Sequence, residues 1–105
     1  MLDELLILKK IKGGDIKAFE ELFRRYYFPL CCYAAGITGQ MEVAEEIVEE
    51  LFYVLWKERE RLQIFQSVKS YLYRATRNQS LQYCEHEEVR NRYLSLIHIS
   101  EPTRP

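Results

Sequence analysis

Between Met41 and Glu60 the apolar residues recur at the spacing of an α-helix. They fall at i, i+3, i+4, i+7, i+8 and i+11, on one side of a helix with about 3.6 residues per turn; they are Ala44, Ile47, Val48, Leu51, Phe52 and Leu55. Most of the opposite side is acidic, with Glu42, Glu45, Glu46, Glu49 and Glu50. The pattern predicts a central helix that buries one face and exposes an acidic one.

Two helices are predicted before the central one. Apolar spacing indicates a short amphipathic helix over Leu2–Ile11, and Gly13 with Gly14 supplies its stop. Asp15 is placed to accept hydrogen bonds as the N-cap of the next helix. A second helix then begins at Ile16.

The apolar stripe of the second helix continues past a proline to Ala34. Pro29 lacks an amide hydrogen and crowds the preceding turn, so we expect a bend near residues 25–28 rather than an end. Gly36 and Gly39 are expected to end the helix.

After Glu60 the periodicity fails across Arg61–Gln66, which indicates a short loop. Ser67 offers an N-cap for a last helix from Val68 to about Arg92, whose charged end is expected to project past the core or fray. Residues 95–105 are expected to be disordered, and Ser100–Pro105 resembles translated vector sequence rather than a native end.

These elements predict an all-α fold, a compact bundle of about four helices in one domain over residues 1–94, with two long helices joined by a short loop at the functional face. The hydrophobic fraction is 48% and the aromatic fraction 13%, which indicates a packed domain rather than a disordered one. The four Gly and three Pro residues leave room for long helices.

The net charge of -1 predicts no polyanionic partner by itself, but the charges are segregated along the chain. Residues 41–60 carry two basic and seven acidic side chains, a local sum of 2 - 7 = -5. Residues 66–83 carry Lys69, Arg74 and Arg77 and no acidic residue, a sum of +3. This segregation is compatible with two different partners.

Several classes of protein are disfavoured. The three cysteines form no disulfide framework, so a reducing cytoplasm is the expected location. We expect no membrane span, because no long apolar run occurs. The sequence contains no nucleophile with a base and no phosphate loop, so we expect neither an enzyme nor a cofactor, and His86 and His98 lack metal-ligand spacing.

Three motifs occur in a fixed order: GDIKAFEELFRRY in 14–26, AEEIVEELFYVLW in 44–56 and SYLYRATRN in 70–78. Together they resemble region 2 of a bacterial sigma factor of the sigma-70 family, closest to the extracytoplasmic-function (ECF) group. The resemblance spans roughly Leu2–Tyr83. It implies an all-helical domain that binds the clamp coiled coil in the largest subunit of RNA polymerase and recognises and melts the promoter -10 element.

Carried over to this chain, the resemblance makes the central helix the polymerase-binding element. The acidic and amide positions of the family motif fall on Glu46 and Glu49, and the implied core-polymerase-binding residues are Glu45, Glu46, Glu49 and Glu50. The family usually has Asp at the position of Glu46 and Gln at the position of Glu49. Such factors often have an anti-sigma factor as a further partner.

The promoter-reading part is implied to be the loop Leu62–Gln66 and the helix after it, with the family's Asn at Asn78. The implied contacts to the non-template strand of the -10 element are Gln63, Gln66, Lys69, Tyr73, Arg74, Arg77 and Asn78. Cations neutralise phosphates, aromatic faces stack on unpaired bases and an amide can bond a base edge. A base extruded into a loop pocket would account for melting without ATP.

Two features differ from the family pattern. After the Asn, family members commonly continue with an Asp and a basic cluster, whereas this chain has Glu85, Glu87 and Glu88. A complete factor of this group also carries a C-terminal helix-turn-helix that reads the -35 element. Nothing here supplies one, so we expect a fragment.

Alternatives remain open at this point. The acidic face could be an ordinary solvated surface, and the chain could be a helical protein-interaction module that never touches DNA. Asn78 is unfavourable inside a helix, which calls for either a buried hydrogen bond or a base contact. Trp56 is expected to pack at the core or its edge.

Overall fold

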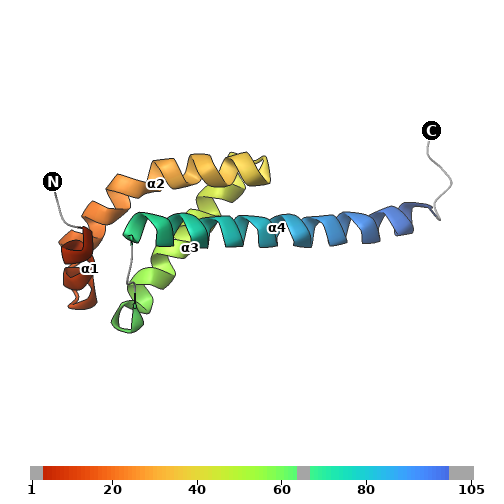
Figure 1. Cartoon of the computed structure of the whole chain (residues 1–105). Helices are drawn as coiled ribbons and strands as arrows, with labels where there is room; N and C mark the ends of the chain where they lie inside the picture. The colour runs from red at the N-terminus through yellow and green to blue at the C-terminus, as the bar shows by residue number, and fades with distance from the viewer. Residues whose placement is uncertain (1–3, 64–66, 100–105) are drawn as a thin grey trace.

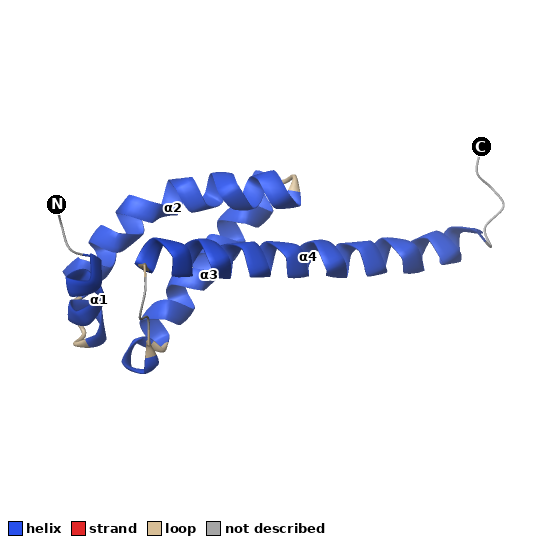
Figure 2. Ribbon diagram, in the orientation of Figure 1, coloured by secondary structure: helices blue, strands red, loops and turns tan. Residues whose placement is uncertain are grey.

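The computed structural model describes residues 4–63 and 67–99, and within them it contains helices and no strand (Figures 1 and 2). In chain order the elements are α1 (Glu4–Lys12), α2 (Ile16–Thr38), α3 (Met41–Lys57), the 3-10 turn η1 (Arg59–Arg61) and α4 (Val68–Ile99). The predicted all-α fold with four α-helices is confirmed. Residues 1–3, 64–66 and 100–105 lie outside the description, and so do the predictions for Leu2, Gln66 and Ser100–Pro105.

The predicted caps are present. The Asp15 carboxylate accepts hydrogen bonds from the backbone N–H groups of Lys17 and Ala18 at 3.1 and 3.2 Å. The Ser67 hydroxyl accepts one from the N–H of Ser70 at 3.2 Å. These side chains satisfy donors that a helix N-terminus leaves unpaired.

The second helix is continuous through Pro29, and its ribbon bends along its length (Figure 1). Of the two glycines predicted to end the helix, Gly39 is the one that does, because α2 runs through Gly36 to Thr38. The end comes at Gly39, whose φ of 79° lies in the left-handed region that favours glycine. Its N–H donates to the carbonyl of Ala35, and the cap fixes the turn into α3.

The third helix ends at Lys57 rather than at the predicted Glu60. Residues 57–61 are all charged, so continuing the helix would bury no apolar surface in return for ordering the backbone. Instead, the Arg59 guanidinium donates to the carbonyl of Trp56 at 2.9 Å and lies over its indole ring, 4.3 Å from the centroid. The chain tightens into η1, and Leu62 then returns to the core.

One apolar core joins all four helices. The largest of its fully buried apolar side chains are Ile11 from α1, Leu22 and Leu30 from α2, Val48 and Phe52 from α3, and Val68 and Leu72 from α4. The Glu4 carboxylate ties α1 to α2, because it accepts from Arg25 at 2.9 Å and from the Tyr26 hydroxyl at 2.7 Å. Burial and this hydrogen bond raise the pKa of Tyr26 to about 12.

The fourth helix extends well beyond the bundle, and the molecule measures 61 × 24 × 22 Å along its principal axes (Figure 1). Of the two predicted outcomes for its charged end, projection is the one observed. The helix reaches Ile99 rather than the predicted Arg92. A formed helix adds one hydrogen bond for each further residue, so it can continue without an apolar stripe.

Candidate functional site

All five glutamates in the first part of α3 are exposed, as predicted, and Ala44, Val48, Phe52 and Leu55 are buried. The four candidate docking carboxylates divide into two pairs, which lie on different flanks of the helix. Glu45 and Glu49 border α2. Glu46 and Glu50 border an open groove beside α4.

Glu49 is held by the neighbouring helix. Its carboxylate accepts a hydrogen bond from the Tyr27 hydroxyl of α2 at 3.0 Å. Burial is the main cause that raises the pKa of Tyr27, and this hydrogen bond adds to it. The pKa of the buried Cys31 thiol is raised mainly by burial, and the negative charges of Glu45 and Glu49 contribute. Both carboxylates therefore lie close to α2, and Glu49 already accepts a hydrogen bond from it.

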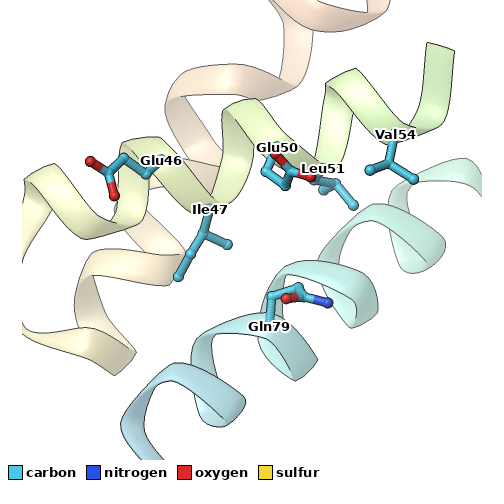
Figure 3. A pocket seen from close by; sticks show the side chains of 6 residues that line it. All are labelled: Glu46, Ile47, Glu50, Leu51, Val54 and Gln79. Atoms are coloured by element: carbon cyan, nitrogen blue, oxygen red, sulfur yellow. The ribbon is translucent and has the colours of Figure 1, made fainter. Parts of the chain in front are cut away.

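The groove between α3 and α4 has a volume of about 460 Å³. Ile47, Leu51 and Val54 of α3 point toward α4, and Gln79 of α4 lies opposite them (Figure 3). Glu46 and Glu50 line the same space. The groove is thus an aliphatic surface bordered by two acids and one amide.

On α4, one face is buried and the opposite face carries the candidate DNA contacts. Val68, Leu72, Thr76 and Ser80 recur every four residues and are fully or almost fully buried. Arg74, Arg77 and Asn78 fall on the other side and are exposed. Among the residues that the structure describes, neither arginine pairs with a carboxylate. The two cations are therefore available to a polyanion.

Asn78 is exposed, which rules out the buried hydrogen bond as the reason for its place in a helix. The base contact stays a prediction.

The other candidates lie around this face in different settings. Gln63 and Lys69 are exposed, one before and one after residues 64–66, and the prediction for Gln66 falls outside the described residues. Tyr73 is half-buried and packs edge to face on Tyr33 of α2, with ring centroids 5.1 Å apart. One side of the Tyr73 ring is thus used in packing.

Trp56 packs at the edge of the core, as predicted. Its ring lies 5.1 Å from that of Phe19, which also meets Phe52 edge to face at 6.1 Å. The indole is half-buried, and Arg59 covers part of it. These ring contacts pack α2 against α3.

Within the described residues, no group of three or more His, Cys, Asp or Glu side chains is placed to hold a metal ion. No helix in that part of the chain is both long and apolar enough to cross a bilayer.

The sequence interpretation missed the groove, although part of its signal was present. Ile47, Leu51 and Val54 follow one another at i, i+4 and i+7, which places them on a common flank of α3 beside the fully buried stripe. Whether α4 would cover that flank or leave it open depends on how the two helices cross. The sequence contains no comparable signal for Gln79.

Comparisons with known proteins agree with this architecture. The family model for sigma-70 region 2 matches residues 22–89. A solved structure of an engineered region 2 of sigmaE in complex with GTAAAA superimposes with a TM-score of 0.71 at 21% identity, covering 85% of this chain and 93% of the other. At that identity the likeness concerns the fold. A search of curated proteins finds no match.

Proposed function

This chain belongs to the sigma-70 region 2 family, and from that premise we propose that it acts in transcription initiation. Its acidic helix α3 binds core RNA polymerase through the clamp coiled coil of the largest subunit. Its helix α4 and the preceding loop recognise and melt the promoter -10 element. The group within the family is proposed to be the extracytoplasmic-function type, as the three motifs suggest.

The observation that carries this proposal is the exposed face of α4. Arg74 and Arg77 stand one turn apart without a carboxylate partner among the described residues, and Asn78 lies beside them. The opposite face of the same turns is anchored in the core. Two exposed cations and an amide on a helix anchored in the core suit a single DNA strand, because the cations position the phosphates and the amide can distinguish a base.

The separation of charge between α3 and α4 also supports the proposal. The acidic residues 41–60 sum to -5 and would repel phosphates, so DNA is favoured on α4 and a basic protein surface on α3. The similar region 2 of sigmaE was solved with the oligonucleotide GTAAAA bound, which makes this sequence the natural first ligand to test.

The DNA-reading part is tested by binding of a labelled GTAAAA oligonucleotide at several salt concentrations, with and without core polymerase. We expect Arg74→Ala with Arg77→Ala to make the negative slope of log K against log salt shallower by about 0.7 for each lost phosphate contact. Asn78→Ala is expected to keep the slope and to lose about 1–3 kcal/mol of discrimination against an altered base.

The matched control is Arg90→Ala with Arg92→Ala, which removes two arginines from the projecting part of the same helix. It should leave binding unchanged. If all the α4 variants bind the oligonucleotide as well as the wild type in the presence of core enzyme, the DNA-reading proposal is wrong. A helical interaction module would then be the better interpretation.

The docking part is tested by capture of core RNA polymerase. Glu46→Lys with Glu49→Lys changes one carboxylate on each flank of α3 and should abolish capture while circular dichroism stays helical. Because all four candidate carboxylates are exposed, these changes should not unfold the domain. Unaltered capture by the folded variant would exclude α3 as the polymerase-binding surface.

A further inference from the structure

The groove beside α4 differs from the rest of the acidic face because it combines aliphatic surface with unpaired acids. Val54 is 41% exposed although it points toward α4, and Ile47 and Leu51 are only half-buried (Figure 3). Glu46 and Glu50 form no ion pair with any described residue. Apolar surface and carboxylates are therefore both available to one partner.

We propose that this groove, rather than the α2-facing flank, is where the partner helix docks. The inference rests on the proposed function for the identity of the partner, a helix of the largest polymerase subunit. It assigns that helix a definite chemistry. An aliphatic side chain enters the space between Ile47, Leu51 and Val54, and lysine or arginine side chains one helical turn apart pair with Glu46 and Glu50.

The spacing of the acids argues for a helical partner. Glu46 and Glu50 are four residues apart, so their positions on α3 are separated by about 6 Å along the axis. Basic residues at i and i+4 of a second helix have the same separation. A helix with an aliphatic side chain between such basic residues would bind by helix-in-groove recognition, in which apolar anchors one turn apart enter an apolar groove.

The volume and lining of the groove argue for an aliphatic anchor. At about 460 Å³ it lies within the range of about 300–1,000 Å³ that is usual for ligand clefts, so it has room for more than one side chain. Gln79 supplies one amide that can donate to and accept from a polar group of the partner. No cation lines the groove among the described residues, so an acidic helix would find no partner there.

The α2-facing flank offers less. The Glu49 carboxylate already accepts from the Tyr27 hydroxyl, and binding a basic side chain there would have to share or displace that bond. Cys31, next to Glu45 and Glu49, is buried under this flank, and the pocket of about 330 Å³ along α2 is lined by Phe19, Glu20, Phe23 and Arg24. A partner placed on this side would meet carboxylates, aromatic rings and an arginine rather than an aliphatic groove.

The experiment measures the affinity of purified core RNA polymerase for charge-matched double variants of the chain. The first, Glu46→Lys with Glu50→Lys, changes the groove. The second, Glu45→Lys with Glu49→Lys, makes the same charge change on the α2-facing flank. We expect the groove variant to bind at least 100-fold more weakly, and the loss in the flank variant to be at least tenfold smaller.

A second pair of variants separates apolar contact from long-range charge. Val54→Asp introduces a charge inside the groove. Tyr53→Asp introduces the same charge at the preceding residue, where the side chain is 59% exposed and does not line the groove. Circular dichroism checks that both variants fold. We expect Val54→Asp to weaken binding about tenfold or more and Tyr53→Asp to leave it within about threefold.

The remaining outcomes would contradict the inference in distinguishable ways. If the flank variant loses binding while the groove double variant and Val54→Asp both keep it, the partner docks on the α2 side. The groove inference is then wrong, and the proposed function still holds. If both double variants lose binding but Val54→Asp matches Tyr53→Asp, general charge attraction explains the data and the groove is overturned. If no variant changes the affinity, docking on α3 fails altogether, and the groove fails with it.

Discussion

The two parts of α4 have the same secondary structure but different surroundings. From Val68 to Cys84 the helix is packed on the bundle, with one residue in every four buried and the Cys84 thiol donating to the carbonyl of Ile37 at 3.4 Å. From Glu85 to Ser95 nearly every side chain is exposed. There the side-chain links are local pairs, Arg90 with Glu87 and Arg92 with Glu88, each at 3.3 Å.

Only the packed part of α4 is held firmly enough to position side chains for a binding partner. Surface ion pairs within a helix contribute about 0.3–0.5 kcal/mol each, which is too little to fix a helix in space. Buried side chains contribute several times more, and they also fix rotation about the helix axis. Arg74, Arg77 and Asn78 lie on the packed part, so their direction is set by the core behind them.

The largest expected effect tests whether the packed part depends on burial. Leu72→Ala removes a fully buried side chain and should lower the free energy of unfolding by about 2–5 kcal/mol, measured by urea denaturation. Leu81→Ala makes the same change on the same helix at a side chain that is 42% exposed, and it should cost less than about 1 kcal/mol, mainly as lost partial burial. Equal losses would mean that the two faces of α4 do not differ as described.

A glycine in each part should separate global from local stability. Gln82→Gly lies in the packed part and should lower the free energy of unfolding by about 1 kcal/mol, because the helix and the bundle unfold together. Val89→Gly lies in the projecting part. It should reduce the helical circular dichroism signal without moving the urea midpoint. A shifted midpoint for Val89→Gly would indicate that the projecting part is coupled to the core.

A smaller effect is expected at the buried hydroxyls of the packed face. Thr76 and Ser80 are fully buried, and in the part of the chain that the structure describes their hydroxyl groups have no hydrogen-bond partner. Thr76→Val keeps the shape and removes the unpaired group, so it should be neutral or stabilise the fold by less than about 1 kcal/mol. A clear loss of stability in urea denaturation would show that this hydroxyl does have a partner, such as an ordered water molecule.

The smallest effect should come from shortening the helix. A chain that ends at Glu87 loses the rest of the projecting part, including both local ion pairs, but no residue of the core. We expect the free energy of unfolding to change by less than about 0.5 kcal/mol and binding of the GTAAAA oligonucleotide to stay the same. Loss of DNA binding by a folded, shortened chain would assign a role to the projecting part.

The helices and their starts could be predicted because their causes are local. Asp15 and Ser67 are caps whose hydrogen bonds reach two or three residues ahead, and the periodic apolar stripes depend only on spacing. The ends were less predictable. α3 stops at Lys57 because Arg59 folds back on Trp56, and α2 continues past Gly36 to the left-handed Gly39. These ends depend on side-chain contacts and backbone angles that apolar periodicity does not encode.

The candidate site could be predicted in part for a similar reason. The acidic residues of α3 and the basic residues of α4 are exposed, as the pattern required. Periodicity does not say which helix covers which flank. It therefore gave no means to foresee that Tyr27 would bond Glu49, or that Tyr73 would pack against Tyr33.

The amino-acid sequence by itself therefore determined four helices, their buried faces and a separation of acidic from basic surface, because spacing and capping act over a few residues. Only the tertiary structure divided the acidic face into a flank held by α2 and a groove shared with α4. That division depends on how α3 crosses its two neighbours, and the crossing is set by the shapes of side chains far apart in the chain. The surface offered to a partner is consequently a property of the packed bundle rather than of any single helix.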